Sequence, residues 1–215
     1  MGVFNEAWGW FTTSTNWHGE DGIPHRLLQH IGYTALTVVI AVVIAVPLGL
    51  WIGHTGRLRG VAVALTGALR ALPTLGLLTL VVLWRGIGLT PPITALVVLA
   101  IPPLLAGAYA GIESVDPRTV DAARGMGMTE WQVLARVEVP LGLPLLLGGL
   151  RSAVLQVVAT ATIAAYIGLG GLGRYVIDGV AIRDYPQILG GSLIVVVLAL
   201  ALDGAFALLQ RLAPA

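Results

Sequence analysis

Few residues in this sequence have the types and spacing that catalysis or ligand binding requires. The stretch 168–173, Gly-Leu-Gly-Gly-Leu-Gly, formally matches the G-x-G-x-x-G pattern of dinucleotide-binding sites. That fingerprint must follow a strand and open a helix, whereas here it follows a long apolar run, so we expect no nucleotide to bind. The glycines are expected to form a tight turn or a re-entrant segment lining a pathway: Gly168, Gly170, Gly171 and Gly173.

Other catalytic or metal-binding constellations are missing from the sequence. The four histidines have no metal-ligand spacing, and there is no cysteine to act as a nucleophile or thiolate ligand: His18, His25, His30 and His54. No G-x-x-x-x-G-K-[ST] motif is found, so the chain cannot hydrolyse ATP through a P-loop. We therefore expect no catalytic residues, no metal and no cofactor of its own.

Three charged residues lie inside long apolar runs, namely Arg70, Arg151 and Asp203. Such charges are costly in a membrane and usually face a bundle interior or a cavity. Counted from the run ends at 1.5 Å per residue, they lie about 15, 15 and 13 Å deep. We therefore expect Asp203 to pair with Arg151, with Arg70 as the alternative partner. A salt bridge between helices and a gate or substrate contact are both open roles.

Composition identifies the solvent of most of the chain. Hydrophobic residues make up 57% of the 215 residues and charged residues 11%, and the mean hydropathy is +0.89. A soluble domain has about 25% charged residues, so this chain needs a lipid bilayer as a partner. The net charge of +1 gives no electrostatic basis for binding nucleic acid.

Apolar runs of roughly 20 residues, the length of a membrane-spanning helix, occur five times. They predict an all-α polytopic membrane protein with five spans. The abundance of glycine and of proline within these runs predicts closely packed, kinked helices. The predicted spans are 32–52, 61–84 (interrupted by Pro73), 93–112, 141–167 and 188–209.

The first 26 residues have no basic region followed by a long apolar run, so we expect no signal peptide. They mix tryptophan with Ser, Thr and Asn, which is typical either of an interfacial segment outside the membrane or of a partly disordered tail. We therefore divide the chain into an N-terminal segment, 1–26, and a transmembrane domain, 27–215.

Arginines in the connections predict the orientation, because basic residues concentrate on the cytoplasmic side. One set of connections has six arginines and the other has four. This bias places the N-terminus outside, the C-terminus in the cytoplasm and the polar insert 113–140 in the cytoplasm. The six are Arg57, Arg59, Arg118, Arg124, Arg136 and Arg211, and the four are Arg26, Arg85, Arg174 and Arg183.

The polar insert reads as two short helices. Asp116 is a favourable N-cap before Pro117, and Gly125 is expected to end the first helix in a left-handed conformation, with Gly127 as a second flexible point. Thr129-Glu-Trp-Gln132 fits a capping box, and Pro140 is expected to end the second helix. The pattern fits either a solvated loop or a docking device.

A signature across this insert favours docking. Asp121-Ala-Ala, then Gly127, then Val137-Glu-Val-Pro follows the pattern E-A-A-x3-G-x9-I-x-L-P with conservative changes. It resembles the cytoplasmic EAA loop of permease subunits of binding-protein-dependent ABC importers. Asp in place of Glu keeps the charge, and the two valines keep apolar bulk. The matching residues are Asp121, Ala122, Ala123, Gly127, Val137, Val139 and Pro140.

The resemblance implies a type I permease core of five spans in a bacterial inner membrane, with no enzymatic activity of its own. It implies separate ABC ATPase subunits that bind ATP and dock on the insert, a second permease copy or a related permease, and an extracytoplasmic substrate-binding protein.

Residues 114–129 and 167–179 resemble the osmoprotectant branch of this permease family, whose substrates include glycine betaine, carnitine and choline. The alternatives are a permease for another small solute such as an amino acid, a secondary transporter or channel, and a membrane-embedded enzyme.

Overall fold

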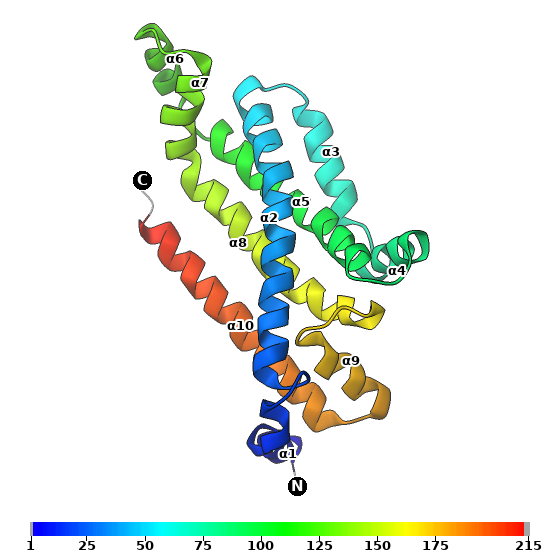
Figure 1. Ribbon diagram of the computed structural model, residues 1–215. Coiled ribbons are helices and arrows are strands. Elements are labelled where there is room, and N and C mark those ends of the chain that lie inside the picture. Colours follow the sequence, from blue (N-terminus) through cyan, green and yellow to red (C-terminus); the bar gives the residue numbers. More distant parts are fainter. Residues whose placement is uncertain (1, 213–215) are drawn as a thin grey trace. The chain divides into compact units, whose positions relative to one another are not determined.

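The computed structural model describes residues 2–212 as helices joined by turns, with no strand in that range (Figure 1). The predicted all-α class is confirmed; positions 1 and 213–215 of the two predicted domains lie outside the described residues. The elements are α1 Val3–Thr12, η1 Ser14–Trp17, α2 Ile23–Thr55, α3 Arg59–Arg70, α4 Thr74–Arg85, α5 Thr90–Glu113, α6 Pro117–Gly125, α7 Glu130–Val133, the π-helical η2 Leu134–Glu138, α8 Val139–Ala164, η3 Ala165–Ile167, α9 Gly173–Ile182 and α10 Tyr185–Leu212.

Four helical segments are long and apolar enough to cross a membrane: α2, α5, the run containing α8, and α10. A fifth span is present only when α3 and α4 are taken together as one broken span. The break falls where the sequence has Pro73, because the residue before a proline is disfavoured in a helix. The described residues therefore contain four spans, or the five predicted when α3 and α4 are counted as one discontinuous span.

The described residues divide into two compact units, and each of the helices α2, α5, α8 and α10 contributes residues to both. Unit 1 contains the described parts of Met1–Val38, Leu72–Val97 and Leu155–Leu202. Unit 2 contains those of Val39–Ala71, Val98–Val154 and Asp203–Ala215.

In unit 2, α2 packs closely on α5 through two glycines spaced one turn apart. A Cβ atom at Gly49 would lie 2.5 Å from Ala108 Cβ, and one at Gly53 would lie 2.7 Å from Ile112 Cβ. Neither position leaves room for a side chain, so small residues set the distance between these helices. This is the close approach that the glycine-rich composition predicts.

The same device joins α5 to α8 in unit 2. A Cβ atom at Gly107 would lie 2.6 Å from Gly149 Cα, and one at Gly111 would lie 2.7 Å from the Gly142 carbonyl oxygen. Backbone therefore meets backbone across this interface, which leaves little slack between α5 and α8.

In unit 1, the N-terminal segment packs on later parts of the chain. The Trp10 ring meets the Tyr175 ring edge to face, with 5.2 Å between centroids. Trp10 also packs against a core formed by Ile23, Leu172 and Tyr175. Burial of aromatic side chains therefore attaches α1 to this core, and α2 already begins at Ile23, within the predicted N-terminal segment.

Candidate functional site

The first helix of the polar insert, α6, begins as its sequence predicts. The Asp116 carboxylate accepts a hydrogen bond from the Arg118 backbone N–H at 2.9 Å, and Pro117 occupies the first helical position. The predicted left-handed residue is wrong: Gly125 stays helical, and Gly127 takes the positive φ of +84°. The Met126 N–H bonds to the Ala122 carbonyl, which carries helical bonding past Gly125 and moves the turn to Gly127.

The second helix, α7, begins with the predicted capping box between Thr129 and Gln132. Its predicted end near Pro140 is wrong, because the chain passes through the π-helical turn η2 and continues as α8. Proline has no N–H to donate, and the wider π-helical bonding just before it is the local change that accompanies its entry into the helix. Figure 1 shows α6 and α7 as a short hairpin leading into α8.

The insert, hereafter the coupling loop (residues 113–140), has a small core of its own. The buried residues of this core are Val115, Val120, Ala123 and Val133, with Met128 and Val137 packed against them. These residues come from the turn after α5, from α6 and from α7, so their burial holds the hairpin closed. The loop is thus a folded platform and not a flexible connection.

The outer surface of the coupling loop exposes two large apolar side chains. Met126 is 77% exposed and Trp131 is 74% exposed, beside the exposed residues Asp121, Ala122 and Gly127. Methionine and tryptophan are enriched at protein interfaces because they bury a large area on contact. This surface is therefore suited to insertion into a partner.

Of the seven residues of the EAA-like signature, some lie on the outer surface of the loop and the others lie in or near its core. Asp121, Ala122 and Gly127 are exposed on the outside of the loop. The other four are buried or partly buried and position the loop: Ala123, Val137, Val139 and Pro140. The signature thus combines residues that could meet a partner with residues that shape the platform.

An ion pair links α6 to α7 across the turn at Gly127. The Arg124 guanidinium donates to both carboxylate oxygens of Glu130, at 3.0 and 2.9 Å. The hydrogen bonds to Glu130 hold the pKa of Arg124 above its usual value. Because both groups are largely exposed, we assign this pair a role in orientation more than in stability.

One histidine that showed no metal-ligand spacing in the sequence joins this region. His54, at the end of α2, places Nδ1 2.5 Å from Glu138 Oε2 and Nε2 3.1 Å from Glu130 Oε2. Sequence reasoning missed this role because Glu138 lies 84 residues further along the chain. The only available signal was a polar residue at the end of an apolar span.

The predicted pairing of charges between spans is found in unit 2. Arg151 Nε and Nη2 lie 2.6 and 2.7 Å from the two carboxylate oxygens of Asp203, and Nη1 donates to Gln210 at 3.1 Å. This two-point geometry is the strong form of an arginine–carboxylate contact. Arg70, the alternative partner, is exposed, and no ion pair involves it among residues 2–212.

The glycine-rich stretch of residues 168–173 lies in unit 1 and forms a turn. Gly168 and Gly171 have φ values of +93° and +84°, which residues with a Cβ adopt at a cost. The Gly171 N–H donates to Gln29 Oε1 of α2 at 3.0 Å, and a Cβ at Gly170 would lie 2.6 Å from the same oxygen. A Cβ at Gly173 would overlap the Thr162 backbone. The turn is therefore packed against neighbouring backbone.

The N-terminal segment adds to this packing. Tyr175, which follows the turn, donates its hydroxyl hydrogen to the Asp21 carbonyl oxygen, and Asp21 also pairs with Arg26. Burial raises the pKa of Tyr175 to about 12, so its hydroxyl stays protonated and remains a donor at neutral pH.

Comparison with known proteins agrees with this arrangement. Residues 45–213 match the family described as "Binding-protein-dependent transport system inner membrane component". A carnitine transport permease protein of Listeria monocytogenes, OpuCB, is 33% identical, with 88% of this chain and 89% of the relative covered. The osmoprotectant import permease protein OsmW of Salmonella typhimurium is 34% identical, with 81% and 84% covered. The choline transport system permease protein OpuBB of Bacillus subtilis is 31% identical, with 87% and 86% covered.

Solved structures show the same fold. The inward-facing MetNI methionine ABC transporter is similar with a TM-score of 0.80 and 20% identity, over 90% of this chain and 96% of the other. An amino acid ABC transporter with histidines gives a TM-score of 0.67 at 25% identity, over 86% and 91%. The family match, the relatives and the helical fold lead to one conclusion: this chain belongs to the inner membrane components of binding-protein-dependent transport systems, as a multi-pass permease subunit.

Proposed function

We propose that the chain is the permease subunit of an ATP-driven ABC importer for osmoprotectants such as glycine betaine, carnitine or choline. The observation that carries this proposal is the match to permeases named for carnitine, choline and osmoprotectants over more than four fifths of both chains. The methionine and amino acid transporters share the fold at lower identity, which gives them less weight for the substrate.

The coupling loop is proposed to dock into separate ATPase subunits that bind and hydrolyse ATP. Its own core makes it a stable platform, and its exposed Met126 and Trp131 provide apolar area for a partner's groove. The absence of a P-loop from the sequence supports a division of labour in which this chain supplies no ATPase site.

Transport then proceeds by movement of helices. Closure of the two ATPases would displace the coupling loops, and the attached spans would pivot between inward-open and outward-open states. A second permease copy or a related permease completes the pathway, and an extracytoplasmic binding protein delivers the substrate. The proposed orientation has the N-terminus outside and the coupling loop and C-terminus in the cytoplasm, as the arginine distribution predicts.

The test is transport by the complete complex in proteoliposomes. The chain is co-expressed with its ATPase and binding protein, reconstituted, and supplied with labelled glycine betaine, carnitine or choline, with ATP or a non-hydrolysable analogue inside. We expect ATP-dependent uptake of at least one of the three. Uptake of labelled methionine but of none of these would replace the substrate class, and uptake without ATP would favour a secondary transporter.

A further inference from the structure

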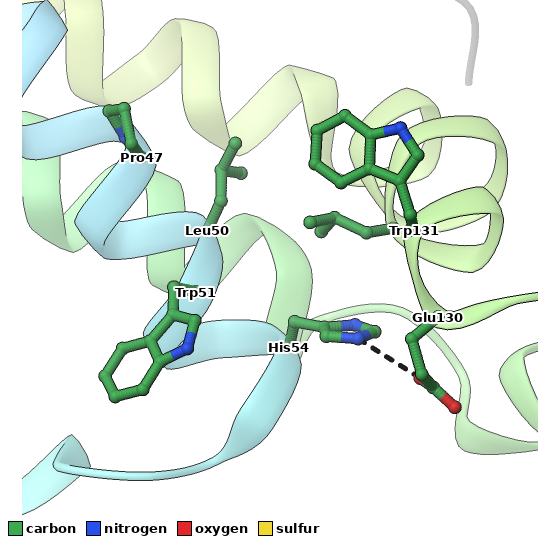
Figure 2. A pocket seen from close by; sticks show the side chains of 7 residues that line it. Pro47, Leu50, Trp51, His54, Glu130 and Trp131 are labelled. Carbon is green, nitrogen blue, oxygen red and sulfur yellow. Dashed lines mark ion pairs between the residues drawn. The ribbon is translucent and has the colours of Figure 1, made fainter.

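His54 lies where the first span meets the coupling loop. Its ring is almost buried, with 12% of the side chain exposed, and Glu138 is more buried still, at 6%. Figure 2 shows His54 pointing from α2 toward Glu130 of α7. One side chain of the first span thus contacts both α7 and the π-helical turn η2.

Each ring nitrogen of His54 faces one carboxylate. Carboxylate oxygens only accept hydrogen bonds, so each ring nitrogen must carry a proton to bond one. With Nδ1 facing Glu138 and Nε2 facing Glu130, both contacts form only with the positively charged imidazolium. The Glu130 carboxylate is shared with Arg124, which leaves the buried Glu138 with His54 as its hydrogen-bonding cation.

The contact of His54 with Glu130 is a polar connection between α2 and α7. A pocket of about 460 Å3 lies between them (Figure 2). Its lining is almost entirely apolar apart from His54 and Glu130, so the two helices are not tightly packed along their whole length. The pocket is lined by Pro47, Leu50, Trp51, His54, Glu130, Trp131 and Leu134.

Where α2 faces α5, the two helices are closely packed. Gly49 and Gly53 bring its backbone against α5, and Gly107 and Gly111 bring α5 against α8. A displacement of His54 is therefore passed to α2, and through the glycine contacts to α5, because closely packed helices move together.

The η2 turn is the other end of the connection. A π-helical turn inside a longer helix is locally under-wound and is frequently found at functional sites. Glu138 is its last residue, directly before α8. His54 thus contacts the last residue before α8, the span that follows the coupling loop.

We propose that His54 is a positioning residue that couples the loop to the first span, acting through its bond to Glu138. This inference rests on the proposed function of an ATP-driven importer. When the coupling loop moves, it displaces α8 because the two are continuous in the chain. It also displaces α2, through the bond between Glu138 and His54. Without the bond, ATP hydrolysis continues while less substrate crosses per ATP.

The experiment measures labelled glycine betaine taken up per ATP hydrolysed in proteoliposomes containing the full complex. The variants are His54→Ala, Glu138→Met and the double variant, with His18→Ala as control because His18 is exposed in the N-terminal segment. The ratio is independent of how much complex assembles, so a variant that only reduces assembly leaves it unchanged. If His54→Ala does not assemble, His54→Leu, which fills space but cannot donate a hydrogen bond, takes its place.

We expect each single variant to lower the ratio by about tenfold or more, because tenfold corresponds to about 1.4 kcal/mol and a hydrogen bond to a charged group contributes at least that order. The double variant should lower it no further, because both residues act through one contact. A normal ratio in either single variant, or losses that multiply in the double variant, would overturn the inference. If the wild type itself shows no ATP-dependent uptake, the proposed function fails instead.

Discussion

The coupling loop and the glycine-rich turn of residues 168–173 are both polar or small-residue interruptions between apolar helices, yet they are held in opposite ways. The loop is held by side chains, through its caps, its ion pairs and its small core, and it leaves large apolar residues exposed. The turn is held by close contact with neighbouring backbone and by a hydrogen bond that the Gly171 N–H donates to Gln29 Oε1.

This difference indicates different tasks. A surface built to meet a partner needs projecting side chains on a defined platform, whereas a segment that closes a bundle needs backbone contact without projections. Substitutions should therefore damage function in the loop and stability in the turn.

The largest expected effect is in chemical labelling, which should be all or none because the two regions are proposed to lie on opposite sides of the membrane. The chain has no cysteine, so single cysteines can be placed at exposed Met126 of the loop and exposed Ile182 beyond the turn. A membrane-impermeant maleimide added to right-side-out vesicles should label Ile182→Cys and not Met126→Cys. Labelling with the reverse pattern would invert the proposed orientation.

Next in size is the effect of a bulky charge in the loop. Gly127→Glu should reduce ATP-dependent uptake by about tenfold or more, because losing 1.4 kcal/mol of docking free energy is already a factor of ten. Gly56→Glu is the matched control: Gly56 has a similar φ of +66° and equally open space, but lies outside the signature. Equal losses in both variants would point to backbone strain and not to docking.

In the turn we expect a loss of stability. Gly173→Ala places a methyl group against the Thr162 backbone, which cannot move away as a flexible side chain would. The unfolding free energy of the purified permease should fall by about 3 kcal/mol, the upper part of the range for overpacking. Gly204→Ala, at a helical glycine with open space, serves as control and should not destabilise. Comparable thermal melting of both variants would contradict the packing account.

The smallest change in stability is expected at the contact between α8 and α10, which are joined by the ion pair between Arg151 and Asp203. Asp203→Asn leaves Arg151 without its anion and should lower the amount of complex recovered in detergent. Adding Arg151→Gln should restore part of that amount, which blotting of the solubilised complex would measure. If the double variant is recovered less well than Asp203→Asn alone, the pair does not act as a unit.

Local rules accounted for much of the fold. The length of the apolar runs indicated the approximate spans. The Asp116 cap and the Thr129–Gln132 capping box predicted where the two loop helices begin. The similar depth of Arg151 and Asp203 in their spans predicted that they pair. The first loop helix ends at Gly125 as predicted, but the left-handed residue is Gly127, and the predicted helix end near Pro140 was wrong, because local propensity ranks several stopping points similarly.

By itself, then, the sequence determined that the chain lies in a membrane, its helical class and the approximate positions of its spans, since these depend on hydropathy and short-range spacing. Only the tertiary structure decided which signature residues face outward, which backbones the glycines admit and that His54 meets Glu138. Contacts between residues 84 positions apart depend on how the helices pack, and no local pattern in the sequence encodes that.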